Sequence, residues 1–131
     1  MAAKTFHGPS AKEAAVIVGV GIDVVDVQRF MDTLQRVPGL RQRLFTPVER
    51  DLPDASLAAR FAAKEAIAKA MGAPGGLSWQ DATVHRIAGG PPRVELSGTV
   101  AAAAERMGIR NWLLSISHDA GIASAMALAQ R

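Results

Sequence analysis

The chain of 131 residues contains no cysteine and no tyrosine. The lack of cysteine excludes disulfides, zinc–thiolate sites and a thiol nucleophile, and it fits a protein of the reducing cytoplasm. No apolar run approaches the roughly 18 residues that a membrane-spanning helix needs. The few aromatic residues are scattered, whereas proteins that stack nucleic-acid bases cluster them beside basic residues. These absences argue against a membrane protein and against a nucleic-acid partner.

The composition is that of a globular domain, with 49% hydrophobic and 21% charged residues. The net charge of +3 suits an anionic partner without choosing one. Residues 1–15 lack both the apolar core of a secretory signal and the arginine-rich pattern of a transit peptide. We expect a poorly ordered N-terminal extension over residues 1–15, one domain over residues 16–131, and a cytoplasmic location.

The first half of that domain starts with a strand and a short helix. Residues 16–25 are rich in β-branched side chains, which predicts a buried strand. Residues 27–37 have helical apolar spacing, and Pro38-Gly39 ends the pattern. Thr46 and Glu49 then form a capping box that starts only a brief turn.

A long helix is predicted over residues 57–71, with Ser56 as its cap and Gly72 at its end. Small and apolar residues share one arc of it: Ala59, Ala62, Ala63, Ala66, Ile67 and Ala70. This arc allows close approach of another backbone. The charged residues spread around the other side: Arg60, Lys64, Glu65 and Lys69.

The second half of the chain favours antiparallel strands. Residues 82–87 and 93–96 predict a hairpin, residues 98–107 a helix closed by Gly108, and residues 112–117 and 122–128 two strands around the turn HDAG. Strands and helices do not alternate strictly. The pattern therefore predicts an α+β fold, with a mainly antiparallel sheet packed on the long helix.

Asp23 is the first candidate for chemistry, because a carboxylate at a strand end needs a partner. The pattern alone favours a helix cap or an ion pair over a metal ligand. The preceding GxG does not complete a dinucleotide-binding fingerprint, since Val24 stands where a third glycine is required.

Glu65 allows two interpretations. It has the favourable orientation for an i to i+4 ion pair with Lys69, which is the ordinary role of such a residue. However, Arg60, Lys64 and Lys69 surround it with positive charge. One carboxylate among cations is what a magnesium–phosphate site requires.

The remaining candidates carry weaker signals. His118 lies at the predicted turn, where a histidine more often bonds locally than acts in catalysis. His7 and His85 belong to no constellation and are expected at the surface. Ser115 and Ser117 alternate as ordinary strand residues, and no serine has the glycines of a nucleophile elbow.

Three stretches resemble, in order and spacing, the signature blocks of the holo-acyl carrier protein synthase family, the small, single-domain bacterial type of 4′-phosphopantetheinyl transferase. They are VGVGIDVVDVQRF (18–30), ARFAAKEAIAKAMG (59–72) and LSISHDAGIASAMALA (114–129). The resemblance runs from about Val16 to the C-terminus and implies the 4′-phosphopantetheinyl transferase fold.

The resemblance implies an enzyme that transfers 4′-phosphopantetheine from coenzyme A to a serine of apo-acyl carrier protein. Adenosine 3′,5′-bisphosphate would be released, and the reaction would serve fatty acid biosynthesis. Magnesium would be required, with manganese as the alternative metal. The family's metal-binding acids fall on Asp23 and Glu65.

Further roles follow from the same resemblance. Glu65 and Lys69 are implied as catalytic residues, Lys69 stabilising or protonating the leaving group. Arg60, Lys64 and His118 are implied near the phosphates of coenzyme A. Arg29 matches the arginine that meets the acidic helix of the carrier protein. Glu65 or a metal-bound water would take the serine proton.

The family usually assembles as a homotrimer with active sites between subunits. This chain departs from many relatives at Ala68, where a serine is common, and at Ile122, where an aromatic residue is common. Two other functions stay open: a small basic binding module for nucleic acid or an acidic protein, and a transferase that serves carrier domains of polyketide or peptide synthases.

Overall fold

The computed structural model describes residues 3–5 and 16–131. His7 and most of the expected N-terminal extension therefore lie outside the described residues. Within that extension, Lys4–Thr5 form a short strand, β1, which pairs with a later strand, β4. No helix in the described part of the chain is both long and apolar enough to cross a membrane.

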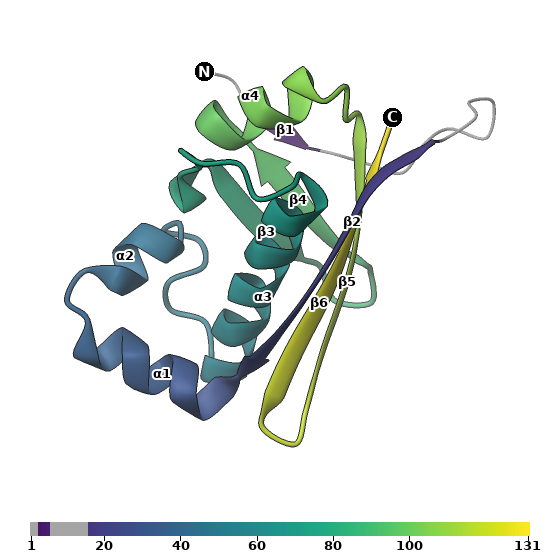
Figure 1. Cartoon of the computed structure of the whole chain (residues 1–131). Helices are drawn as coiled ribbons and strands as arrows, with labels where there is room; N and C mark the ends of the chain where they lie inside the picture. The colour runs from purple at the N-terminus through teal and green to yellow at the C-terminus, as the bar shows by residue number, and fades with distance from the viewer. Residues whose placement is uncertain (1–2, 6–15) are drawn as a thin grey trace.

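The larger of two sheets has three antiparallel strands in the order β2-β6-β5 (Figure 1). These are β2 (Ile17–Asp26), β5 (Asn111–Asp119) and β6 (Ile122–Gln130). The turn between β5 and β6 is Ala120-Gly121, and both residues have positive φ, as a two-residue hairpin turn requires. The predicted strands are confirmed, and β5 and β6 extend beyond the predicted bounds. The expectation that the first strand is buried was wrong, because only one face of β2 packs on α3 and apolar residues of the other face, such as Ile22, are exposed.

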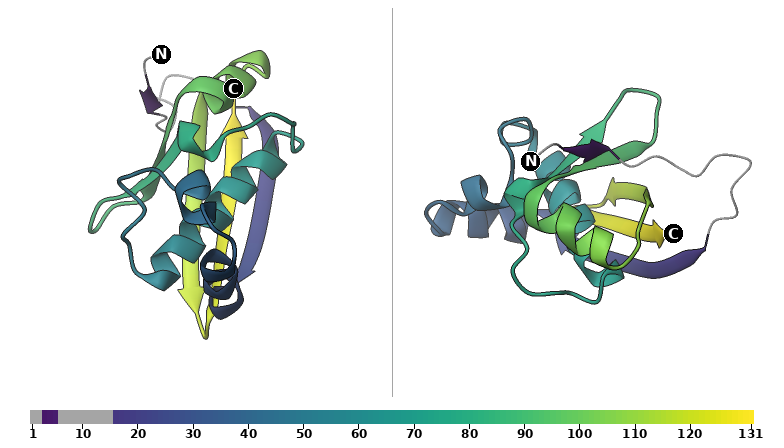
Figure 2. Two further views of the ribbon diagram at one scale, coloured as in Figure 1. Left: turned by 90° about the vertical axis from the view of Figure 1, so that its left-hand side faces the viewer. Right: turned by 90° about the horizontal axis from the view of Figure 1, so that it is seen from above.

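Helix α3 (Asp54–Ala70) lies along the inner face of this sheet (Figures 1 and 2). Gly19 and Gly21 of β2 face it. A Cβ atom at Gly21 would lie 1.8 Å from the backbone oxygen of Ala66, and one at Gly19 would lie 2.0 Å from that of Ala70. The GxG sequence therefore serves close contact between strand and helix.

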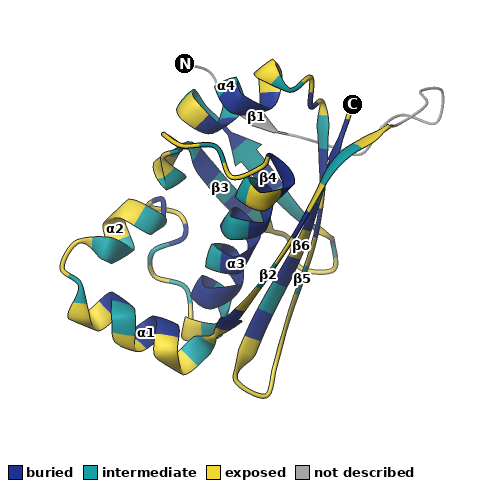
Figure 3. Cartoon of the chain, viewed as in Figure 1, coloured by how far each residue is buried: buried dark blue, intermediate teal, exposed yellow. Residues whose placement is uncertain are grey.

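The alanine arc of α3 is buried as predicted, but two details of the helix were wrong. Helix α3 begins at Asp54, directly after Pro53, so Ser56 lies inside its first turn and is not the cap. The charged residues do not share one exposed side, because Arg60 and Lys64 are also buried. Figure 3 shows most of α3 in the colours of buried and intermediate residues.

The second sheet covers another side of α3. It has the order β1-β4-β3, with β3 (Ala82–Arg86) and β4 (Pro92–Leu96) forming the predicted hairpin. His85 of β3 pairs with Glu95 of β4 at 3.1 Å. The predicted helix α4 (Gly98–Arg106) follows, and Gly108 comes directly after its last turn.

Two helices and a single turn of 3-10 helix complete the fold. The predicted helix α1 (Val27–Arg36) starts at Asp26, whose side chain accepts the N–H of Arg29 at 2.9 Å. Helix α2 (Leu40–Leu44) and the turn η1 (Trp79–Asp81) were not predicted. Phe30 of α1 stacks on Phe61 of α3, with ring centres 4.7 Å apart.

Candidate active site

A groove of about 320 Å³ lies where the end of β2, the start of α1 and the middle of α3 meet. Its lining residues are Asp23, Val24, Val25, Asp26, Arg29, Phe30, Thr33, Phe61 and Glu65. Three of the residues singled out in the sequence, Asp23, Glu65 and Arg29, therefore share one groove. The fold brings them together because β2 runs along α3 and continues directly into α1.

Asp23 is held by an ion pair inside this site. It lies on the inner face of β2, and its Oδ1 is 3.0 Å from Lys69 Nζ, which also donates to the backbone oxygen of Ile22 at 3.0 Å. The helix cap nearby is Asp26, not Asp23. Lys69 thus pairs with the acid of the neighbouring strand instead of with Glu65 on its own helix.

Glu65 lies beside this pair, and its surroundings oppose its ionisation. Burial raises the pKa of the Glu65 carboxyl, and the charge of Asp23 raises it further. A hydrogen bond from the Trp79 side chain and the charge of Lys69 lower this pKa but do not cancel the increase. Asp23 and Glu65 therefore repel each other across the groove, and a cation there would relieve the repulsion.

The donor set fits magnesium. Mg²⁺ prefers hard oxygen ligands and is commonly bound by one or two carboxylates, with water and substrate phosphates as the other ligands. Among residues 3–5 and 16–131, no group of three or more histidine, cysteine, aspartate or glutamate side chains could hold a metal. Two carboxylates facing one groove suit an ion that is shared with a substrate.

Lys64 is not part of the groove. Its ammonium group is fully buried and donates to Glu49 Oε1 at 2.6 Å, to the backbone oxygen of Leu44 at 2.8 Å and to that of Trp79 at 3.2 Å. These three acceptors use all three N–H donors of a lysine. The expected contact of Lys64 with phosphates therefore does not fit this geometry, and the expected cationic arc around Glu65 is wrong in this respect.

Arg60 faces the same side of α3 as Lys64. Its guanidinium donates to the backbone oxygens of Val84 at 3.3 Å and Ser56 at 3.4 Å, and the residue is 9% exposed. Burial lowers the pKa of Arg60, although the charge of Glu49 opposes this effect. In one chain, Arg60 does not line the groove.

His118 is exposed near the end of β5. His118 of β5 lies opposite Ala123 of β6, which in turn lies opposite Val25 of β2. Asp23 of β2 lies opposite Ala125 of β6, in the next inward-facing row. His118 thus lies two strands from β2, a separation of roughly 10 Å at the usual strand spacing. A single chain does not bring His118 to the groove.

Comparison with known proteins identifies the family. The model of the 4′-phosphopantetheinyl transferase superfamily matches residues 19–121. The chain belongs to this superfamily. The holo-[acyl-carrier-protein] synthase of Beutenbergia cavernae is 69% identical over 116 residues, which are 88% of this chain and 100% of that protein. The prediction of a phosphopantetheinyl transferase enzyme is thereby confirmed.

Solved structures of this superfamily share the fold. The acyl carrier protein synthase of Plasmodium yoelii with ADP bound has a TM-score of 0.80 and 31% identity, over 90% of this chain and 98% of that one. The holo-[acyl-carrier-protein] synthase of Helicobacter pylori in complex with coenzyme A has a TM-score of 0.72 and 31% identity, over 84% and 98% of the two chains. The predicted α+β transferase fold is confirmed.

Sequence reasoning missed two residues that hydrogen-bond Lys64 on the buried side of α3, Glu49 and Trp79. Glu49 was noted only for its capping box, in which its carboxylate accepts the N–H of Thr46 at 3.0 Å. Its partner Lys64 is distant in sequence, so no local pattern reveals the pair. Trp79 belongs to a single helical turn and carries no motif.

Proposed function

We propose that this enzyme transfers 4′-phosphopantetheine from coenzyme A to a serine hydroxyl of apo-acyl carrier protein and releases adenosine 3′,5′-bisphosphate. The observation that carries the proposal is the common groove of Asp23 and Glu65, within a fold whose relatives include a synthase in complex with coenzyme A. The bond that breaks joins the pantetheine phosphate to the rest of the diphosphate. The bond that forms joins this phosphate to the serine oxygen.

Magnesium is the proposed cofactor, with manganese as the alternative. Asp23 and Glu65 would hold the ion, which would neutralise negative charge on the diphosphate. Either Glu65 or a metal-bound water would accept the serine proton.

Lys69 is proposed to stabilise the leaving phosphate. Its side chain is 51% exposed, so it can reach a ligand in the groove from its position beside Asp23. An ammonium group there offsets charge that develops on the departing oxygen and is able to donate a proton to it. Lys64, which has no remaining donor, is assigned no contact with the phosphates.

Arg29 is proposed to meet the carrier protein. It is exposed on α1 at the edge of the groove, so an acidic partner bound there would lie close to Asp23 and Glu65. Charge complementarity of this kind raises the rate of encounter and fixes the orientation of the partner. The mild positive net charge of the chain supports the same role.

The active enzyme is proposed to be a homotrimer with active sites between subunits. The outer face of β2, β6 and β5 carries exposed apolar side chains: Val20, Ile22, Val24, Leu113, Ile122 and Met126. An apolar face of this kind usually marks an interface. Assembly would also let His118 and Arg60 of one subunit serve the phosphates at the groove of another.

The carrier preference separates this function from its nearest alternative. The curated relatives are named for acyl-carrier protein, which favours a role in fatty acid biosynthesis over service to polyketide or peptide synthases. A cytoplasmic location belongs to the same proposal. No described feature favours a binding module without chemistry.

Mass spectrometry of the carrier protein tests the proposal. The enzyme is incubated with coenzyme A, Mg²⁺ and either apo-acyl carrier protein or an apo carrier domain of a polyketide synthase. We expect the phosphopantetheine adduct first on the acyl carrier protein, and no adduct in EDTA. Absence of the adduct on every carrier would overturn the function, and full activity of Glu65→Gln would overturn the proposed metal ligand.

A further inference from the structure

The hydrogen bonds of the buried Glu49–Lys64 ion pair join five segments of the fold: α2, the loop after it, α3, η1 and β3. Lys64 belongs to α3, and Glu49 belongs to the loop that follows α2. Both side chains are fully buried, and their charged atoms are 2.6 Å apart. A charge pair in the core is seldom needed for stability alone, because apolar replacements of similar volume are often as stable. The position of this pair therefore calls for a further reason.

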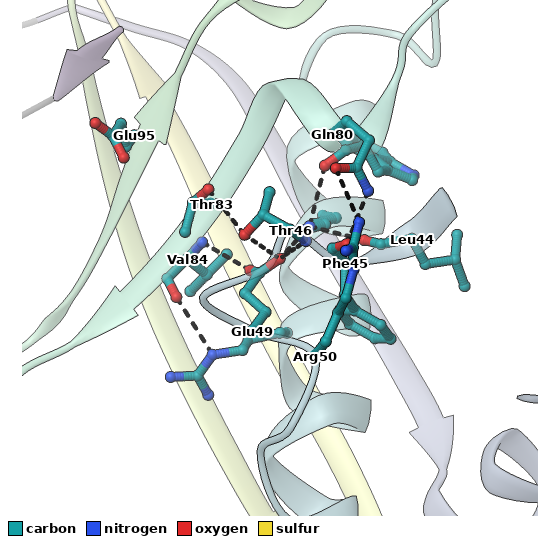
Figure 4. A network of polar contacts seen from close by, with 12 residues as sticks. Leu44, Phe45, Thr46, Glu49, Arg50, Gln80, Thr83, Val84 and Glu95 are labelled. Carbon is teal, nitrogen blue, oxygen red and sulfur yellow. Dashed lines mark hydrogen bonds and ion pairs between the residues drawn. The ribbon is translucent and has the colours of Figure 1, made fainter. Parts of the chain in front are cut away.

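Every polar atom of the pair is used. Glu49 Oε1 accepts from Lys64 and from the backbone N–H and the hydroxyl of Thr46, at 2.6, 3.0 and 3.3 Å, and Oε2 accepts the N–H of Val84 at 2.9 Å. Figure 4 shows Glu49 between Thr46 and Val84, and the hydroxyl of Thr83 directed toward that of Thr46. A network with all partners present fixes its members in one arrangement.

The network leads to Glu65 by two routes. Lys64 directly precedes Glu65, so fixing the Lys64 side chain fixes the helical turn that presents Glu65 to the groove. Lys64 also donates to the backbone oxygen of Trp79 at 3.2 Å, and the Trp79 side chain acts on the Glu65 carboxyl, whose pKa it lowers. The same Trp79 lines a second, mostly apolar pocket of about 500 Å³.

We propose that Glu49 and Lys64 are a positioning pair for the transferase reaction. The pair holds the Glu65 carboxylate in its position directly through α3 and indirectly through Trp79. This inference rests on the proposed function, because it assigns a purpose to the exact placement of Glu65. Neither member of the pair touches substrate. Trp79 is the third member of this positioning group.

The test uses a double variant, Glu49→Gln with Lys64→Met, which removes both charges together. Its net electrostatic effect on Glu65 is therefore small, while the donor to the Trp79 oxygen is lost. We expect kcat to fall about tenfold, the scale of one lost hydrogen bond at a reacting group, with KM for coenzyme A changed less than twofold. The thermal midpoint Tm is measured in parallel. A matched control is Ile109→Ala, a cavity at a buried residue between α4 and β5, which should lower Tm but leave kcat unchanged.

Tryptophan fluorescence gives a readout that does not depend on turnover. The chain has two tryptophans, so Trp112→Phe leaves Trp79 as the single reporter. In that background we expect Trp79 emission to respond to Mg²⁺ with coenzyme A, and the double variant to lose most of this response. An unchanged kcat together with an unchanged response would overturn the positioning role.

A second variant covers the case in which the double variant does not fold. Trp79→Phe keeps an aromatic wall but removes the indole N–H, and we expect the same selective loss of kcat with little change in Tm. Full kcat in Trp79→Phe would overturn the route through Trp79. A wild-type protein that modifies no carrier would instead contradict the proposed function. In that case the fluorescence response would still show whether Glu49 and Lys64 hold the Trp79 side chain in position.

Discussion

The carboxyl of Glu65 links the site to the stability of the protein. Its folded-state pKa is raised by burial and by Asp23, so the protonated form stabilises the fold at low pH, and this contribution is lost as pH rises through the folded pKa. We expect Glu65→Gln to have a higher Tm than the wild type at neutral pH without metal. The same variant should lose transfer activity by about 10²- to 10³-fold.

Calorimetry in EDTA across the pH range checks this expectation. The difference in Tm between wild type and Glu65→Gln should shrink as pH falls, because the wild-type carboxyl becomes neutral. Asp51→Asn, at an exposed carboxylate outside the groove, is the control and should show no such difference. A Glu65→Gln variant that is less stable at neutral pH would contradict the repulsion between Asp23 and Glu65.

Arg29 allows a separate prediction about the carrier protein. Because it is exposed at the rim of the groove, Arg29→Glu should repel an acidic partner without disturbing Asp23 or Glu65. We expect KM for apo-acyl carrier protein to rise about tenfold or more, with kcat at saturation changed less than about threefold.

Steady-state kinetics at several salt concentrations measures this effect. The rise in KM for apo-acyl carrier protein should be largest at low ionic strength, since salt screening weakens interactions between exposed charges. Arg106→Glu, which reverses an exposed charge at the end of α4, is the matched control. Equal defects in the two variants would mean that overall charge, and not the position of Arg29, attracts the carrier.

At the scale of elements, the contact between β2 and α3 positions the two acids. Gly21 permits this contact, because an added Cβ would lie 1.8 Å from a backbone oxygen of α3, which cannot move aside as a side chain could. We expect Gly21→Ala to destabilise the protein by about 3 kcal/mol or more.

Urea denaturation followed by circular dichroism measures this change. Gly75→Ala is the control, because nothing lies within 4 Å of a Cβ added there and its backbone does not have positive φ. It should change the free energy of unfolding by less than about 0.5 kcal/mol. Similar stability of the two variants would show that the strand does not need its close approach to the helix.

The elements that were predicted correctly are those with a clear period or a clear stop signal. Strand β2 has its β-branched run, and the strands β5 and β6 flank a glycine turn. Helix α2 and the turn η1 are too short to show an apolar repeat, so no pattern in the sequence predicted them.

The sequence predicted those residues of the site that differ in charge from their immediate sequence neighbours. Asp23 stood out as a carboxylate at the end of an apolar strand, and Glu65 as one acid among three cations. Lys64 was misjudged because a helical projection shows which residues share a side but not what covers that side. Here, β3 and the loop containing Glu49 cover it, and both are distant in sequence. The long-range contacts of the fold decide the role of such a charge.

At the scale of the whole molecule, the outer sheet face determines the proposed assembly. Met126 lies on the central strand β6 beside Ile22 of β2, and both are exposed in a single chain. We expect Met126→Glu to convert a trimer into monomers, because a charge in an apolar interface loses its hydration. Sedimentation velocity measures the mass. Val48→Glu, at an exposed apolar residue elsewhere, is the control and should leave the mass unchanged.

Complementation between inactive variants tests whether the sites are shared. Glu65 and His118 do not meet in one chain, so a site that uses both requires two subunits. We expect Glu65→Gln and His118→Ala to be inactive separately. In randomly mixed trimers, about a quarter of the interfaces would combine Glu65 of one chain with His118 of another, and activity should recover to about that fraction. Mixing is achieved by unfolding and refolding the two variants together, with each variant refolded alone as the control. If the trimer forms but the mixture stays inactive, His118 does not act across the interface.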